Sequence, residues 1–242
     1  MTTRNRGKET GDDALFGSAK TILRIKEALK DMSYLLSRNY PEKASSELVG
    51  NNYKLKTRQI KVLRTASASN QQLENRKSKQ FFISCLKDKI IYLDGFNIVI
   101  LLESLLSGAY IFQGLDSCYR DLSGVHGTYK RVHQTQKSIE LVSSFFKKSK
   151  AEKLIWVFDK PVSNSGRIKQ LISSFAEENQ LNWDVILENN PDKYLIEQYY
   201  PIISSDAWIL DECKNWFNLT DYIIKEEKLK VNLINFYQNE SV

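Results

Sequence analysis

The sequence predicts an α/β fold in which helices cover both faces of a mostly parallel central sheet, preceded by a small all-helical module. From residue 89 onward, short apolar runs alternate with amphipathic segments, as parallel strands and their crossover helices do. Before that point, apolar residues recur every three or four positions from Leu15 to Leu36. We therefore expect a disordered tail over residues 1–13, a basic helical module over 14–80 and an α/β domain over 81–242.

The first module is expected to contain three helices. The apolar stripe predicts a helix that ends just before Pro41, because the residue before proline avoids helical geometry. A second helix over residues 41–49 would stop at Gly50, and a third is expected over residues 57–66. Two short helices joined by a glycine-containing turn resemble a helix-turn-helix. The polar segment 67–79 is either a linker or a further helix.

Four apolar runs in the second module predict buried strands, and helices are expected between them. The strands are expected over residues 89–93, 154–158, 183–187 and 201–205. The helices are expected over residues 96–106, 131–148, 166–178 and, near the end of the chain, 220–230.

Charge is divided unequally between the two modules. Residues 1–87 carry 18 Lys and Arg against 8 Asp and Glu, whereas residues 88–242 carry 17 against 21. A basic module attracts polyanions, most often nucleic acid. The cations that would contact phosphates on the third helix are Lys54, Lys56, Arg58, Lys61 and Arg64. The alternative is a packing module with a solvated basic face.

Composition excludes several classes of protein. Three widely separated cysteines and two histidines argue against a disulfide framework and against a zinc site. The first residues are too polar for a signal peptide, and the most apolar stretch contains Asp94, Asn97 and Glu103. We therefore expect a cytoplasmic protein with no membrane segment. Nucleotide-binding glycine motifs and a nucleophile elbow are also absent from the sequence.

Three of the predicted strands run into an aspartate, namely Asp94, Asp159 and Asp206. Parallel strands end at one edge of a sheet, where two carboxylates about 4 Å apart repel by roughly 4 kcal/mol. Such a cluster requires a cation or a raised pKa, and oxygen ligands suit Mg²⁺ or Mn²⁺. Asn97 would orient a water or ligand at this edge. The alternative for Asp94 and Asp206 is that each caps the following helix.

Two further acids are candidates for the same site. Asp121 lies in a glycine-bearing loop and is a candidate metal ligand. Glu103 lies in an otherwise apolar helix, where a charge needs a partner or water. Glu103 is therefore either another acid of the site or a salt-bridged structural residue.

Two loops carry the features of phosphate sites, because glycine backbone and helix starts favour anions. In the first loop the candidate substrate-binding residues are Arg120, His126 and Gly127. In the second they are Ser163, Asn164 and Arg167. The alternatives are an ordinary glycine-bearing loop and a simple helix cap.

The motif Leu93-Asp94-Gly95-Phe96-Asn97, followed by Asp159 and by Ser204-Ser205-Asp206, resembles PIN-like nucleases of the NYN branch. This resemblance implies a PIN-like three-layer sandwich and a metal-dependent endoribonuclease, with RNA rather than DNA as partner. It implies that Asp94, Asp159 and Asp206 are metal-site acids and that Asn97 is a polar helper. The helix acid that is typical of the family has only Glu103 and Asp121 as candidates.

Residues 28–220 are also similar to a prokaryotic family catalogued as domain of unknown function 434. The segments that carry this similarity are residues 34–38, 47–51, 120–129 and 161–167. The similarity implies no activity. The leading hypothesis is hydrolysis of RNA phosphodiester bonds. The alternatives are a nucleic-acid-binding protein with a degenerate site and a small phosphohydrolase that acts on nucleotides through the glycine loop.

Overall fold

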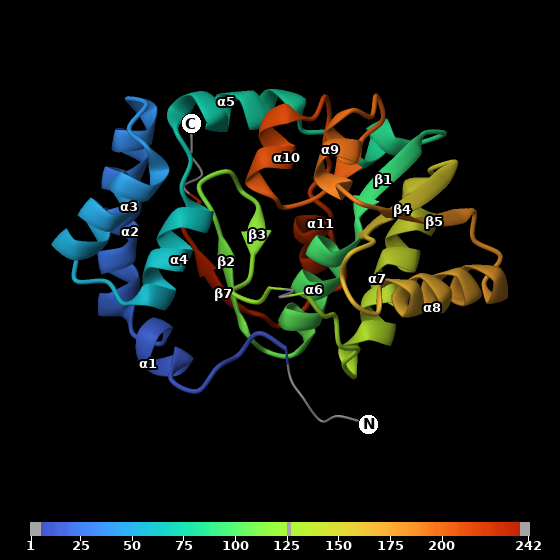
Figure 1. Cartoon of the computed structure of the whole chain (residues 1–242), viewed down its shortest axis with the longest axis horizontal. Coiled ribbons are helices and arrows are strands. Elements are labelled where there is room, and N and C mark those ends of the chain that lie inside the picture. The colour runs from blue at the N-terminus through green and yellow to red at the C-terminus, as the bar shows by residue number, and fades with distance from the viewer. Residues whose placement is uncertain (1–5, 125–126, 238–242) are drawn as a thin grey trace.

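The computed structural model, which describes residues 6–124 and 127–237, contains a parallel sheet of four strands, seen at the right of Figure 1. The strand order is β5–β4–β1–β6. The strands are β1 (Ile90–Asp94), β4 (Lys153–Asp159), β5 (Trp183–Glu188) and β6 (Ile202–Ile203). All three pairings are parallel, so the carboxyl ends of the strands share one edge. The four predicted strands and the mostly parallel sheet are confirmed.

Both faces of this sheet are covered, which explains the apolar runs of β1, β4 and β6, whereas the edge strand β5 exposes Asp184. Ile91 and Leu93 of β1 belong to a core with Trp156 and Phe158 of β4. Tyr92, between them, faces the opposite core. Side chains of consecutive strand residues point to opposite faces of the sheet. Because both faces are covered here, residues on both faces of β1 are buried.

The helices form one layer on each face of the sheet. The first layer contains α6 (Gly95–Leu106), α7 (Gln134–Ser149), α8 (Ser165–Glu178) and α11 (Leu219–Glu226). The second layer contains α9 (Pro191–Ile196) and α10 (Ala207–Glu212). A short 3₁₀ helix, η1 (Ile83–Leu86), precedes β1. The predicted arrangement of helices on both faces of the sheet is confirmed.

A second, smaller sheet was not predicted from the sequence. It consists of β2 (Tyr110–Gln113), β3 (Tyr119–Arg120) and β7 (Asn232–Asn235), with β2 in the middle. Strand β3 is antiparallel to β2, and β7 is parallel to it. Residues 119–120 were expected in a loop, but they pair with β2.

Five helices precede the main sheet. They are α1 (Asp12–Phe16), α2 (Ala19–Ser37), α3 (Glu42–Asn52), α4 (Thr57–Ala66) and α5 (Asn70–Lys79). The predicted helices correspond to α2, α3 and α4, and the segment 67–79 is a further helix. A capping box that joins Ser69 to Gln72 begins α5.

The helices of this module do not have a core of their own. Ile25 and Leu29 of α2 and Val62 of α4 pack in one cluster with Phe112 of β2 and Ile234 of β7. The N-terminal helices therefore pack against the small sheet, which includes β7 from near the end of the chain. No helix in the described ranges combines the length and apolar character that a membrane crossing requires.

Residues 6–13 have specific contacts, although the sequence predicted a disordered tail over residues 1–13. Asp12 is buried, and both of its carboxylate oxygens accept hydrogen bonds from Arg58, at 2.8 and 2.9 Å. The pairing compensates the burial of the charge, so the contact ties α1 to α4.

Replacement of Gly95, the first residue of α6, tests the close packing at the end of β1. A Cβ at this position would lie 2.5 Å from the Phe158 ring, so Gly95→Ala forces that buried ring to move. We expect the free energy of unfolding in urea to fall by about 1–3 kcal/mol. Gly166→Ala is the matched control, because nothing lies within 4 Å of its added Cβ. The control should be neutral or stabilising by up to about 1 kcal/mol. Equal effects of the two substitutions would contradict the packing argument.

Candidate functional site

Two pairs of side chains join the end of β1 to the end of β6. The Ser204 hydroxyl donates to Asp94 Oδ2 at 2.7 Å. Asn97 Oδ1 accepts from the Ser205 backbone N–H at 2.9 Å and from its hydroxyl at 2.8 Å. The two motifs identified in the sequence, Asp94 with Asn97 and Ser204 with Ser205, are therefore in direct contact. Asn97 positions β6 as well as facing the candidate site.

Asp94 lies in a strongly unfavourable environment for a carboxylate. Burial raises its pKa from 3.8 to about 8, although the hydrogen bond from Ser204 acts in the opposite direction. The negative charges of Asp192, Asp206 and Asp159 raise this pKa further. The three predicted aspartates therefore interact electrostatically at one edge of the sheet.

Asp192 is an acid of this edge that the sequence analysis missed. It lies in the first turn of α9, which follows β5. Burial raises its pKa, and the charges of Asp206 and Asp159 add to the shift. The missed signal was the position of Asp192 five residues after the expected end of the third strand, Leu187. The rule that identified the other acids required an aspartate directly after a strand, so it did not include Asp192.

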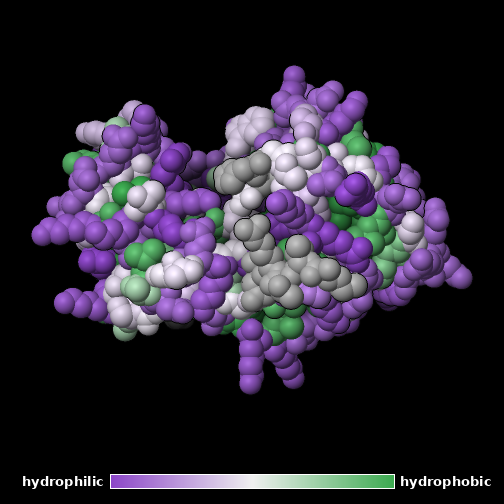
Figure 2. Space-filling view, turned by 60° about the horizontal axis from the view of Figure 1, so that its bottom comes forward, coloured by the Kyte–Doolittle hydropathy of each residue, from purple (hydrophilic) through white to green (hydrophobic). Residues whose placement is uncertain are grey.

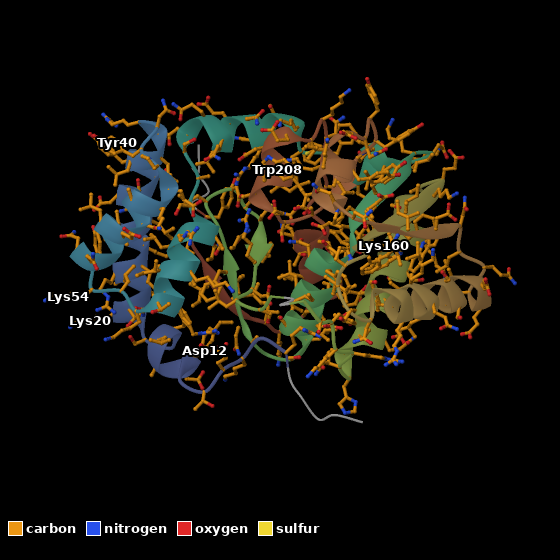
Figure 3. All side chains as sticks on the ribbon, in the orientation of Figure 1. Asp12, Lys20, Tyr40, Lys54, Lys160 and Trp208 are labelled. Carbon is orange, nitrogen blue, oxygen red and sulfur yellow. The ribbon has the colours of Figure 1, made fainter. Side chains whose placement is uncertain are left out.

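Asp159, at the end of β4, is half-buried. Burial raises its pKa, and its own backbone N–H partly offsets that effect. The exposed Lys160, which is labelled in Figure 3, follows it directly.

The helix-cap alternative applies to Asp206 but not to Asp94. Asp206 Oδ1 accepts hydrogen bonds from the backbone N–H groups of Trp208 at 2.9 Å and Ile209 at 3.2 Å. Asp94 occupies the N-cap position of α6, but its side chain makes no capping hydrogen bond. Its carboxylate is directed instead to Ser204.

The acids form a charged edge rather than a complete set of metal ligands. Within residues 6–124 and 127–237, no three His, Cys, Asp or Glu side chains are grouped closely enough to hold a metal ion by themselves. Mg²⁺ usually keeps several waters and takes only one or two carboxylates from the protein. The donor set of Asp94 and its acidic neighbours fits that mode of binding, in which waters fill the other positions.

Asp121, a predicted metal ligand, lies on the wall of a cleft beside this edge. Its Oδ2 accepts from the Ser104 hydroxyl at 2.5 Å and from the Ser123 backbone N–H at 3.1 Å. These bonds hold Asp121 against the end of α6 that is remote from Asp94.

Glu103 is the structural residue of the two alternatives. It is completely buried, accepts from the hydroxyls of Tyr129 and Thr135 at 2.5 Å each, and forms an ion pair with Arg6. Burial raises its pKa, while the charge of Arg6 and the two hydroxyls act to lower it. The ion pair compensates the buried charge.

Arg120, which the sequence predicted to bind substrate, lines the cleft and also has a structural role. It is buried, and its two terminal nitrogens donate to the Asp116 carboxylate at 2.8 and 2.6 Å. Its Nε donates to the Ser205 carbonyl at 2.9 Å. Arg76 of α5 donates to the same Asp116 at 2.6 Å. Arg120 is therefore a structural residue that supports the end of β6.

The electrostatics of Asp116 agree with this structural role. Burial acts to raise its pKa, but the charges and hydrogen bonds of Arg120 and Arg76 outweigh burial and lower it. Asp116 is therefore ionised and shared between the two arginines.

The two predicted phosphate loops meet and bond to each other. The Ser163 N–H donates to the Gly127 carbonyl at 2.9 Å, and the Tyr129 N–H donates to the Ser163 carbonyl at 3.0 Å. Asn164 Nδ2 donates to the Tyr129 carbonyl at 2.8 Å. Gly127 has a φ of 71°, which favours glycine. Asn164 and these backbone groups therefore hold the loops together.

The other two residues predicted to bind substrate in these loops are Arg167 and His126. Arg167 is exposed in the first turn of α8. His126 lies outside the described residues, so its predicted role stays a prediction.

A cleft of about 770 Å³ runs between α4 and the carboxyl edge of the sheet. The α4 side contributes Thr57, Ile60, Lys61, Arg64 and Thr65. The sheet side contributes Phe96, Asn97, Ser205, Asp206 and Ala207. Figure 2 shows a notch in the surface between the left lobe, where Figure 1 places α2 to α4, and the larger part of the molecule.

Several of the basic side chains on or beside α4 have partners within the chain. Arg58 pairs with Asp12, and Arg64 pairs with Glu42 on the surface. Lys61 donates to the carbonyl of residue 122 at 2.8 Å. Surface pairs of this kind are weak, so a phosphate can displace Glu42 from Arg64 more easily than Asp12 from Arg58.

Family models match both the α/β part and the N-terminal helices of the chain. The family model described as "Domain of unknown function (DUF5616)" matches residues 83–222, more than half of the sequence. The chain belongs to the DUF5616 family.

This DUF5616 protein is also similar to a second family model and to an archaeal protein. A second model, "Protein of unknown function (DUF434)", matches residues 24–79, so the similarity to family 434 belongs to the N-terminal helices rather than to residues 28–220. The chain is 32% identical over 188 residues to "Uncharacterized protein MJ0935" of Methanocaldococcus jannaschii, which covers 77% of this chain and 88% of the relative. No solved structure matches the chain significantly.

The raised pKa of Asp94 predicts how the stability of this DUF5616 protein depends on pH when divalent ions are chelated. Asp94 keeps its proton to about pH 8 in the folded state and to about pH 4 in the unfolded state. The folded state binds more protons between these values, so the contribution of Asp94 to the free energy of unfolding falls as the pH rises. The slope is at most about 1.4 kcal/mol per pH unit.

Urea denaturation of wild type and Asp94→Asn at pH 5 and pH 8, with EDTA, measures this contribution. Asparagine does not titrate, so the wild type should lose stability relative to the variant between the two pH values. A difference between the proteins that is the same at both pH values would contradict the raised pKa.

Proposed function

We propose that this protein is a metal-dependent endoribonuclease that hydrolyses RNA phosphodiester bonds at the carboxyl edge of its parallel sheet. The observation that carries the proposal is the burial of Asp94 among the charges of Asp159, Asp192 and Asp206. A cluster of carboxylates in a site of low dielectric is stabilised by a cation or by protonation. Oxygen ligands alone favour Mg²⁺ or Mn²⁺ over softer metals.

The cleft beside this edge supports a polyanionic substrate. Its wall on α4 carries Lys61 and Arg64, and Asp206 lies on the opposite wall. A phosphate backbone in the cleft would contact these cations while one phosphate approached the acidic edge. Such contacts are independent of sequence. The proposal also includes the resemblance to PIN-like nucleases that the sequence motifs suggested.

The residues of the edge would either hold the metal ion or position other residues of the site. Asp94, with Asp159 and Asp192, would hold Mg²⁺ or Mn²⁺ directly or through water. The bound ion would supply Lewis-acid polarisation of the phosphate and activation of water. Ser204 fixes the orientation of Asp94, and Asn97 fixes the end of β6 that carries Asp206.

Two observations favour a second function, nucleic-acid binding without cleavage. The described residues contain no preformed group of three metal ligands, and one oxygen of Asp206 is used to cap α10. A small phosphohydrolase that uses the glycine loop has less support. The Ser163 N–H, a candidate donor to its phosphate, already donates to the Gly127 carbonyl.

Cleavage of end-labelled RNA in Mg²⁺ or Mn²⁺ tests the proposed activity. We expect Asp94→Asn to lower the rate at least about 100-fold, because a catalytic metal contributes several kcal/mol to transition-state stabilisation. Asp184→Asn is the control, because this carboxylate lies near the start of β5, away from the acidic edge. Cleavage that Asp94→Asn leaves unchanged would refute the assignment. Tight RNA binding without cleavage in either metal would establish the second function instead.

The same variants provide a measurement that does not depend on activity. Mg²⁺ or Mn²⁺ should raise the melting temperature of the wild type and of Asp184→Asn, because a ligand that binds only the folded state stabilises it. The increase should be lost in Asp94→Asn. An equal increase in all three proteins would place metal binding elsewhere.

A further inference from the structure

Trp208 is the exception among the four tryptophans of the chain. Trp156 and Trp216 are completely buried, and Trp183 is 8% exposed. Trp208 is 46% exposed. Figure 3 labels it on α10, beside the centre of the molecule. The core therefore does not account for Trp208.

The backbone fixes Trp208 next to the acidic edge. It lies in the first turn of α10, and its N–H donates to Asp206 Oδ1 at 2.9 Å. Asp206 and Ala207, the two preceding residues, line the cleft. The following residues, Ile209 and Leu210, are completely buried and anchor the helix. The ring is therefore carried by a rigid element at the margin of the cleft.

We propose that Trp208 is a stacking platform for a base of single-stranded RNA. This inference rests on the proposed function and specifies its substrate, because a base in a duplex already stacks on its neighbours. Aromatic rings bind bases of any sequence, since every base has a π-face. Trp208 directly follows Asp206 and Ala207, which line one side of the cleft, and the cations Lys61 and Arg64 line the side formed by α4. A single strand could therefore place a base on Trp208 and its backbone in the cleft.

Tryptophan fluorescence provides a direct test, because Trp208 is the accessible indole. The wild-type protein in EDTA, which prevents metal-dependent cleavage, is titrated with a 12-nucleotide oligouridylate and with a blunt 12-base-pair RNA duplex. Fluorescence anisotropy of labelled RNA reports binding in parallel. We expect the single strand to quench the emission and to bind more tightly than the duplex.

Substitutions separate stacking from general attraction. Trp208→Ala should weaken binding of the single strand about 5- to 150-fold, the range that loss of one stacked base produces. Trp208→Phe keeps an aromatic ring and should retain most of the affinity. Tyr199→Ala is the matched control, because Tyr199 is an exposed aromatic residue that precedes β6, at the end opposite Asp206. Its affinity should equal that of the wild type.

The outcomes distinguish this inference from the proposed activity. Binding that Trp208→Ala leaves unchanged, or equal affinity for the duplex, overturns the stacking role even if the protein cleaves RNA. Quenching by the single strand without cleavage in Mg²⁺ or Mn²⁺ supports stacking and refutes the nuclease. Failure to bind either RNA, as expected if Trp208 contacts a protein partner, overturns both.

Discussion

The hydrogen bonds of Ser204 and Ser205 hold the whole candidate site together. Ser204 binds the carboxylate of Asp94 at the end of β1, and Ser205 binds Asn97 in the first turn of α6. The carbonyl of Ser205 accepts from Arg120 on β3. Through Asp116, Arg120 is connected to Arg76 on α5. One short segment after β6 therefore fixes the main sheet, the small sheet and the N-terminal helices relative to one another.

This arrangement places the buried carboxylate of Asp94 close to three other carboxylates, where little solvent can stabilise its charge. Arg76 and Arg120 are balanced by two carboxylates, because Arg76 also pairs with Asp211, so the burial of this network is tolerated. Asp94 differs. Burial and the charges of three neighbouring carboxylates raise its pKa to about 8, because the hydrogen bond from Ser204 lowers the pKa by less than these effects raise it. Two buried acids on the same side of the molecule thus have opposite pKa shifts. The compensated acid is structural, and the uncompensated acid is the one proposed to bind a cation.

Particular elements show how far sequence reasoning reaches. The strands β1, β4, β5 and β6 were predicted because strands buried on both faces are apolar throughout. The strands β2 and β7 were missed, because Tyr110 pairs with Asn232, more than a hundred residues away, and neither strand has a period of its own. The structural role of Arg120 was not predicted, because sequence alone does not show that this side chain donates to Asp116 and to the Ser205 carbonyl. Asp192 was overlooked, because it lies in the first turn of α9 and not directly at the end of a strand.

The sequence by itself determined the α/β class, the helical N-terminal region and the strand ends that carry Asp94, Asp159 and Asp206. These features follow from local periodicity and from the rule that parallel strands end at one edge. Tertiary structure decided which charges are compensated. It paired Glu103 with Arg6 and Arg120 with Asp116, and it left Asp94 among other acids. The reason is that the free energy of a buried charge depends on groups within a few ångströms in space, which the fold brings from distant parts of the chain.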